Sequence, residues 1–350
     1  MVLVNNPGTW RAVYPPLRHA EWHGFTPTDL IFPFFLFIVG VAIPLALGRR
    51  VSAGQPRSSV VMKVLRRSAI IFALGLLLHA IPNFDLATLR IPGVLQRIAV
   101  CYLAAALIFL WTGWRVQAGL AVAFLLGYWA VLALVPVPGF GTGRLDPEGN
   151  LAAYVDRALF GQHVWRVARV YDPEGLLSTV PAIATTLCGV LAGGWLRTAG
   201  SRRTIVLGFL AAGLGGIVLG EVWHEWLPIN KALWTSSYAL LTAGAALVAL
   251  AACYWLVEMR GHRAWTRPFV VLGVNALALF FLSSLVARLL IVLKVPGGAG
   301  PISLHGWLYG HLFAPWASAP NASLAYAMAY LALWLGVLWL LDRYHVRLTV

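Results

Sequence analysis

Residues 30–47 read LIFPFFLFIVGVAIPLAL, and this stretch decides the fold because it contains no charged side chain. A helix needs roughly 20 mainly apolar residues to cross the hydrocarbon core of a bilayer. Barrel strands are shorter and alternate between apolar and polar residues, whereas this run is continuous. The stretch therefore predicts a membrane-spanning helix.

Further apolar runs of this kind follow along the chain. The predicted spans are residues 30–47, 61–82, 91–112, 116–136, 176–196, 204–220, 235–257, 268–293 and 322–341. The composition agrees, because 60% of the residues are hydrophobic and only 11% are charged, against roughly 25% charged in an average soluble domain. We predict an all-α, polytopic integral membrane bundle with about nine complete spans, in which residues 1–350 form one transmembrane domain.

The first residues of the chain interrupt this pattern. Met1-Val2-Leu3-Val4 is apolar and is followed at once by Asn5-Asn6-Pro7-Gly8. We expect this segment to be the last turn of a truncated, additional spanning helix.

Basic residues are distributed unevenly between the two sides of the predicted bundle. The connections at 48–67, 113–115, 197–203, 258–267 and 342–347 hold 15 basic residues and two acidic ones, and the opposite connections hold ten of each. Basic loops face the cytoplasm, so the balanced set faces outward and includes a long extracytoplasmic loop at residues 137–175.

The net charge of +14 thus follows from topology, and we expect no nucleic-acid partner, since no reader motif is present. We expect a multi-pass protein of the bacterial inner (plasma) membrane.

The first group of candidate functional residues precedes the first span, in His19-Ala20-Glu21-Trp22-His23-Gly24. Imidazole acts as a base or a nucleophile near neutral pH; alternatively, this is a solvated interfacial loop with Trp22 as an anchor. Thr26-Pro27-Thr28-Asp29 matches a helix capping box. Asp29 is also placed to orient a nearby histidine, as carboxylates do in catalytic triads.

Polar residues near the outward ends of later spans form the second group. Gln96-Arg97 lies inside a predicted span, about two turns from its outer end, and an ionisable residue there indicates function unless it snorkels to the interface. Tyr171-Asp172-Pro173-Glu174-Gly175 is explained either by function or by a turn before a helix. Lys231, next to Asn230, could bind an anionic substrate or pair with Glu225.

Small residues inside the spans indicate packing. Gly189 with Gly193, and Gly216 with Gly220, have the small-xxx-small spacing of closely packed helices. Cys101, Cys188 and Cys253 lie in apolar runs and are interpreted as small buried side chains, so we expect neither a disulfide framework nor a metal.

Several of these segments together resemble the heparan-α-glucosaminide N-acetyltransferase family. The matching blocks, in the order of the family, are VNNPG (4–8), HAEWHGFTPTDL (19–30), FPFFLFIVG (32–40), IPGVLQRI (91–98), YDPEG (171–175) and PINKALW (228–234). The resemblance extends over most of the chain. The soluble lumenal domain of the animal enzyme and the family's first helix, with its acidic and Arg-Gly motif, have no counterpart in this sequence.

The resemblance implies transfer of an acetyl group from acetyl-CoA to an extracytoplasmic amino sugar or glycan at the lipid bilayer. The family's active-site histidine falls on His19, which would act as general base or as acetyl-accepting nucleophile, with Asp29 orienting it. Arg97 would stabilise charge in the transition state or bind the donor. The candidate substrate-binding and donor-binding residues are Asn6, Trp22, Gln96, Arg97, Asp172, Glu174, Asn230 and Lys231.

Two other functions remain open at this stage. A glycan or lipid transporter or flippase would use Arg97 and the outer loops to bind its substrate, although no internal repeat of the kind common in transporters is visible. A structural scaffold fits poorly with a Gln-Arg pair inside a span. A homo-oligomer is compatible with the sequence.

The charge distribution makes a testable prediction about topology. Reporter fusions after Arg203 and after Gly149 should report opposite sides of the membrane, because the first point lies in the basic set and the second in the balanced set. Signals from the same side at both points would contradict the assignment.

Overall fold

The computed structural model describes residues 1–297 and 300–346. Arg347, which belongs to the basic set predicted to face inward, lies outside the described residues. The α-helices are α1 (Val2–Asn5), α2 (Ile31–Ser52), α3 (Arg57–Ala80), α4 (Val94–Trp111), α5 (Trp114–Leu134), α6 (Leu151–Phe160), α7 (Thr179–Thr198), α8 (Arg202–His224), α9 (Ser236–Tyr254), α10 (Arg267–Val274), α11 (Ala276–Val292), α12 (Leu304–Leu312) and α13 (Ala319–Arg343).

Short elements complete the fold. The 3-10 turns are η1 (Pro15–Leu17), η2 (Pro27–Leu30), η3 (Leu86–Thr88) and η4 (Gly161–His163), and η5 (Trp255–Met259) is a π-helical continuation of α9. The strands β1 (Lys294–Val295) and β2 (Ile302–Ser303) pair antiparallel, with Lys294 opposite Ser303. The chain is thus an all-α, multi-pass membrane protein, as predicted.

Seven helices in the described part of the chain are long and apolar enough to cross a membrane. They are Pro27–Ser52, Val94–Trp111, Trp114–Leu134, Thr179–Thr198, Arg202–His224, Ser236–Met259 and Ala319–Arg343. Each contains one of the predicted spans or overlaps most of it. The apolar residues at the start of the sequence form the four-residue helix α1.

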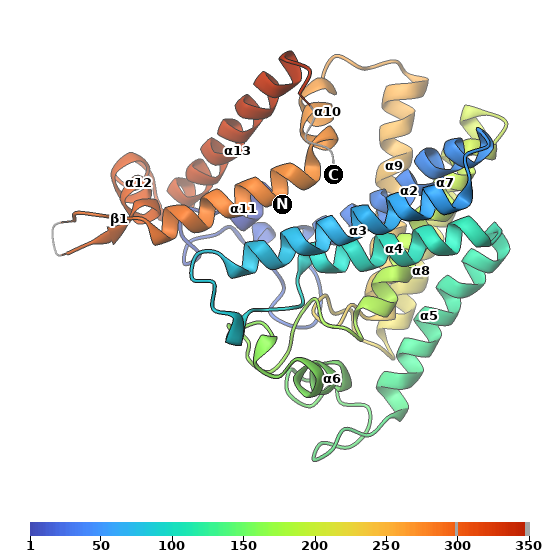
Figure 1. Ribbon diagram of the computed structural model, residues 1–350, viewed down its shortest axis with the longest axis horizontal. Helices are drawn as coiled ribbons and strands as arrows, with labels where there is room; N and C mark the ends of the chain where they lie inside the picture. Colours follow the sequence, from blue (N-terminus) through green and yellow to red (C-terminus); the bar gives the residue numbers. More distant parts are fainter. Residues whose placement is uncertain (298–299, 347–350) are drawn as a thin grey trace.

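Two predicted spans are not among these seven helices. The predicted span 61–82 is the helix α3, which packs along α4 (Figure 1) and carries Lys63, Arg66 and Arg67 in its first half, so its apolar content is lower than that of the seven. The predicted span 268–293 is broken at Asn275 into α10 and α11, which meet at an angle of 77°. The average hydropathy of a stretch of sequence does not reveal such a break in a helix.

The helices pack closely where glycines face one another. Gly189 of α7 meets α2 so tightly that an added Cβ would lie 2.0 Å from the Phe37 carbonyl oxygen and 3.0 Å from the Cα of Gly40. Gly216 and Gly220 of α8 bring α9 to similar distances. The small-xxx-small prediction is therefore confirmed: the first pair of glycines brings α7 against α2, and the second brings α8 against α9.

Figure 1 shows α2, α3, α4, α7, α8 and α9 gathered into one bundle, while α10 to α13 extend to one side. The predicted loop at 137–175 contains the helix α6, which begins where the Asn150 side chain accepts a hydrogen bond from the Ala153 N–H. The connections between the helices, together with the first turns of α2 and α4, carry most of the candidate site.

The three cysteines are free, but they are not equally buried. Cys101 is buried as predicted, Cys188 is half-buried and Cys253 is exposed. The prediction is therefore wrong for Cys253. Lipid is as apolar as a protein core, so a small apolar side chain on a membrane helix need not be covered by protein.

Because α2 and α7 are in such close contact, the effect of a Gly→Ala substitution on stability should depend strongly on its position along α7. Gly189→Ala should lower the thermal unfolding midpoint of the detergent-solubilised protein, because overpacking costs about 1–3 kcal/mol or more. Gly194→Ala, on the same helix with open space around it, should leave the midpoint unchanged or raise it. Equal midpoints for both variants would show that α2 and α7 do not pack as described.

Candidate active site

The capping box at the start of the first span holds a buried carboxylate. Asp29 is 0% exposed, and the reciprocal Thr26–Asp29 bonds of the capping box are both present. Its Oδ2 accepts the backbone N–H groups of Ala20 and Thr26, each at 3.0 Å. Its Oδ1 lies 2.6 Å from Nδ1 of His19. The structure therefore brings His19 and Asp29 together.

Two groups compete for Nδ1 of the imidazole. The Asp29 carboxylate oxygen at 2.6 Å accepts only and calls for a proton on Nδ1, whereas the Lys231 ammonium at 2.8 Å donates only and calls for a lone pair there. The shorter contact with the carboxylate favours the neutral tautomer with its proton on Nδ1 and a lone pair on Nε2. The His19 side chain is 41% exposed, so Nε2 belongs to a ring that is open to solvent.

Lys231 approaches the same carboxylate from the connection between α8 and α9. Its Nζ lies 3.1 Å from Oδ1 of Asp29, 2.8 Å from Nδ1 of His19 and 3.5 Å from Nε2 of His19. The alternative pairing of Lys231 with Glu225 is therefore wrong. Burial lowers the pKa of Lys231 below its ordinary value, although the carboxylates of Asp29 and Glu174 act in the opposite direction.

Asn230 organises the turn that presents Lys231. Its side-chain oxygen accepts the Leu233 N–H at 2.8 Å, and its backbone N–H donates to the Thr235 hydroxyl at 3.0 Å. The Asn230 side-chain nitrogen also lies 3.4 Å from Nδ1 of His23. Burial and the nearby His224 lower the pKa of His23. Asn230 is fully buried, and its hydrogen bonds close the turn that carries Lys231.

Trp22 links the histidine loop to the long connection between α5 and α7. Its indole N–H donates to the Leu145 carbonyl at 2.8 Å, and its ring meets that of Tyr171 edge to face at 4.9 Å between centroids. Trp22 is half-buried. These contacts within the protein account for its position without a role as an anchor at the membrane interface.

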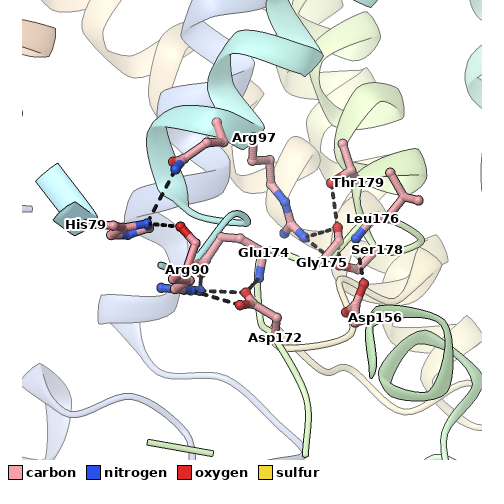
Figure 2. Close-up of polar contacts among 11 residues, drawn as sticks. His79, Arg90, Arg97, Asp156, Asp172, Glu174, Gly175, Leu176, Ser178 and Thr179 are labelled. Atoms are coloured by element: carbon pink, nitrogen blue, oxygen red, sulfur yellow. Dashed lines mark hydrogen bonds and ion pairs between the residues drawn. The ribbon is translucent and has the colours of Figure 1, made fainter. Parts of the chain in front are cut away.

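Arg97 is buried inside the bundle, and Figure 2 shows it reaching from α4 toward the start of α7. Nη2 donates to the Ser178 hydroxyl at 2.5 Å and to the Gly175 carbonyl at 3.2 Å. The guanidinium lies over the Trp234 ring at 5.1 Å, and Nε and Nη1 have no hydrogen-bond partner in the described part of the chain. With 2% exposure, Arg97 does not snorkel, so that alternative is wrong.

The depth of Arg97 in its helix also differs from the prediction. The helix α4 begins at Val94, after Pro92 and Gly93, so Arg97 lies in its first turn rather than two turns inside. Its neighbour Gln96 is buried, with its side-chain nitrogen 3.4 Å from Nδ1 of His79 and its oxygen unpaired.

Asp172 and Glu174 are engaged by an arginine that the sequence analysis did not select. Arg90 donates from Nε and Nη2 to Asp172 at 2.8 and 2.5 Å, and Nη2 also donates to Glu174 at 2.5 Å (Figure 2). Such a two-bond fork is among the stronger charged contacts in proteins. Both carboxylates raise the pKa of Arg90, against the effect of its burial. Two features of the sequence could have pointed to Arg90. It directly precedes the matching block 91–98, and the outward-facing connections to which it belongs hold ten acidic residues.

Asp156 of α6 is a second buried acid that the sequence analysis missed. It is 1% exposed, and it accepts the Leu176 N–H at 2.9 Å beside the segment that Arg97 binds (Figure 2). Burial raises the pKa of Asp156 to about 7; Asp172 adds to the rise, and the Leu176 hydrogen bond, Arg97 and Arg157 oppose it. No pattern in the sequence distinguishes Asp156 from a surface carboxylate on a short helix.

The candidate residues thus form two neighbouring groups. His19, Asp29 and Lys231 make up the first, and Asn230 and Trp22 hold its loops. Gln96, Arg97, Asp172 and Glu174 belong to the second, together with Arg90 and His79. Asn6 is in neither group: its side-chain nitrogen donates to the Val2 carbonyl at 2.7 Å, and it lines a cavity beside Gln96.

Comparison with known proteins places this arrangement in a family. A family model described as a domain of unknown function (DUF5009) matches residues 7–189. The human protein (Homo sapiens) named heparan-alpha-glucosaminide N-acetyltransferase is 31% identical over 341 residues, covering 80% of this chain and 50% of the human protein. The protein of the same name from Mus musculus is 31% identical over 338 residues, with the same coverage of 80% and 50%.

The chain spans about half the length of these curated relatives. It belongs to the heparan-α-glucosaminide N-acetyltransferase family, as the sequence blocks predicted.

The raised pKa of Asp156 predicts a pH-dependent stability. A carboxyl that holds its proton more tightly when folded stabilises the protein below its unfolded pKa of about 4. That contribution is lost as the pH rises through the folded pKa of about 7. The thermal midpoint of the wild type, relative to Asp156→Asn, should therefore fall between about pH 4 and 7 and level off above that. Asp146→Asn is the control, because the bonds from Arg144 and the Gly149 N–H lower the pKa of Asp146. A flat or rising difference for Asp156→Asn would contradict the assignment.

Proposed function

We propose that this chain is a membrane acetyltransferase that moves an acetyl group from acetyl-CoA to the amino group of an extracytoplasmic amino sugar or glycan. The proposal is supported by two relatives that are named N-acetyltransferases. It is carried by one observation in this chain, the contact of 2.6 Å between Nδ1 of His19 and the buried Asp29 carboxylate. A carboxylate on one imidazole nitrogen prepares the other for proton transfer or nucleophilic attack.

In the direct route, His19 acts as a general base. The acceptor amine attacks the thioester carbonyl, the carbon–sulfur bond breaks, and the amine proton passes to Nε2. The proton then neutralises the departing CoA thiolate. The product is an amide, and the imidazole returns to its starting form with its Nδ1 proton still held by Asp29.

In the covalent route, Nε2 itself attacks the thioester carbonyl. The carbon–sulfur bond breaks, an acetyl-imidazole forms on His19, and CoA leaves. The acceptor amine then attacks the acetyl carbon, Nε2 is released, and the amine proton is taken up by the imidazole or by solvent. Both routes use the same tautomer, so the Asp29 contact serves either one.

Lys231 supplies positive charge where either route develops an oxyanion. Its Nζ is 3.5 Å from Nε2 of His19, so a carbonyl group that reacts at Nε2 lies within its reach. Donors placed at a developing oxyanion lower the barrier of acyl transfer. The short turn organised by Asn230 holds Lys231 in this place.

Arg97 has a different task in this proposal. Its buried guanidinium binds Gly175 and Ser178 instead of solvent, so it fixes the segment that carries Asp172 and Glu174. Tyr171 at the start of this segment contacts Trp22, three residues after His19. Arg97 is therefore a positioning residue. It holds the outward-facing segment 171–175 in place, and this segment forms the part of the site where the acceptor binds.

The location of the site follows from the predicted topology. His19, Lys231 and the 171–175 segment all lie in connections of the charge-balanced set, which faces outward. We assign the protein to the bacterial plasma membrane, with its acceptor on the outer side.

Replacement of His19 should remove activity without removing the protein from the membrane. Proton transfer by a positioned side chain contributes about 10²–10⁴-fold to a rate, so His19→Ala should lower acetyl transfer from radiolabelled acetyl-CoA at least about a hundredfold. His23→Ala is the matched control, because His23 lies four residues away and does not contact Asp29. Both variants should accumulate in membranes at wild-type levels.

The covalent route makes one additional demand. Protein incubated with acetyl-CoA alone should retain acetyl label, and His19→Ala should abolish it; lack of label would leave the general-base route. Near-normal transfer by His19→Ala would contradict both routes. No transfer by the wild type to any amino sugar would leave transport of a glycan or lipid as the function to test.

A further inference from the structure

Lys231 is one of three lysines in the chain, and it is the one that lies beside the reacting imidazole. Its Nζ is 3.5 Å from Nε2 of His19 and 2.8 Å from Nδ1 of the same ring. The other two lysines, Lys63 in α3 and Lys294 in β1, are exposed and lie elsewhere in the fold. The protein therefore holds a primary amine of its own at the place where an acceptor amine would react.

The proton on Lys231 decides whether this amine is a nucleophile, because an ammonium group has no lone pair. The contact of 2.8 Å between Nζ and Nδ1 needs one donor and one acceptor. When Asp29 keeps the proton on Nδ1, an uncharged Nζ satisfies this contact by accepting, whereas an ammonium group does not. Burial also lowers the pKa of Lys231, as it does for other buried lysines that react as amines.

Two carboxylates oppose this loss of charge. Oδ1 of Asp29 lies 3.1 Å from Nζ, and Asp29 and Glu174 both act to raise the pKa of Lys231. Lys231 thus has two forms in one position: the ammonium group stabilises an oxyanion, and its conjugate base is a competing acceptor. The side chains of Lys231 and His19 are 23% and 41% exposed, so molecules that enter from solvent reach both.

We propose that Lys231 is a self-acetylation site, whose Nζ receives the acetyl group when the donor is present and no acceptor is bound. The inference rests on the proposed acetyl transfer. The uncharged Nζ attacks the carbonyl carbon either of the thioester or of an acetyl-imidazole on His19. In the first case the carbon–sulfur bond breaks, and the Nζ proton, carried by His19, neutralises the CoA thiolate. In the second case the carbon–Nε2 bond breaks, its electron pair returns to Nε2, and the Nζ proton passes to solvent.

The product switches the site off. An acetylated lysine has an uncharged amide in place of its ammonium group, so the oxyanion loses its positive partner. The buried Asp29 carboxylate also loses the charged contact at 3.1 Å. An acceptor amine bound at Nε2 competes with Nζ for the acetyl group, so the acceptor protects the enzyme. Activity is therefore lost only while the donor is present without an acceptor.

The test measures modification of the wild type and needs no variant. Detergent-solubilised full chain is incubated with 13C-labelled acetyl-CoA without an acceptor, treated with hydroxylamine and digested, and mass spectrometry gives the acetyl occupancy of each lysine. Hydroxylamine removes an acetyl group from imidazole but not from an amide, so label on His19 is distinguished from label on Lys231. The occupancy of Lys231 should exceed that of Lys63 and Lys294 at least about tenfold, because an amine held at reacting distance has a large effective concentration.

Two variants make the result specific. His19→Ala should lower the occupancy of Lys231 at least about tenfold, because the group that carries the proton or the acetyl is lost, and it should leave Lys63 and Lys294 unchanged. Lys231→Arg keeps the charge but has no amine to acetylate. After incubation with acetyl-CoA alone, the wild type should lose activity in proportion to its acetylated fraction, whereas Lys231→Arg should keep its own starting activity.

The outcomes separate this inference from the proposed function. Glucosamine, at a concentration at which the wild type acetylates it, should lower the occupancy of Lys231. Transfer to glucosamine by a protein whose Lys231 carries no more acetyl than Lys63 and Lys294 would overturn self-acetylation alone, and so would equal occupancy of Lys231 in the wild type and His19→Ala. Acetylation of Lys231 that depends on His19, without transfer to any amino sugar, would overturn the proposed acceptor alone.

Discussion

The rest of the site depends on the buried carboxylate of Asp29. A charge without contact to water is stable only when its lone pairs are satisfied, and here Ala20, Thr26, His19 and Lys231 all reach it. These partners come from the N-terminal loop, the start of α2 and the connection before α9. The Tyr238 hydroxyl also donates to the Asp29 backbone carbonyl at 2.6 Å. One carboxylate thus contacts both the imidazole and the lysine beside it, and it holds the two side chains next to each other.

A second buried charge orders the neighbouring segment by other means. Arg97 has no carboxylate within ion-pair distance among the described residues, and the Trp234 ring, the Ser178 hydroxyl and the Gly175 carbonyl bind it instead. Trp234 is itself fully buried and belongs to the same short connection as Lys231. The two buried charges therefore both contact the short connection before α9, through Lys231 and Trp234, and together they stabilise the loops that join the starts of α2, α4, α7 and α9.

The sequence predicts the parts of this account that depend on local pattern. Continuous apolar runs place the spans, Gly189 marks the contact with α2, and the spacing from Thr26 to Asp29 gives the helix start and the proximity of His19. Contacts between distant segments are not encoded in that way. Lys231 reaches His19 across 212 positions of the chain, and Arg90 reaches Asp172 across 82. The break at Asn275 and the burial of Asp156 likewise depend on which neighbours surround them, and hydropathy averaged along one segment carries no such information.

The central claim is that Asp29 holds the Nδ1 proton of His19 and leaves Nε2 free to react. Nitrogen NMR of protein labelled with 15N-histidine tests this most directly, with the His19 signals assigned by their loss in His19→Ala. At neutral pH the account predicts a protonated Nδ1 with a strongly deshielded proton and an unprotonated Nε2, and a loss of that pattern in Asp29→Asn. A proton on Nε2 of the wild type, with Nδ1 unprotonated, would contradict the account.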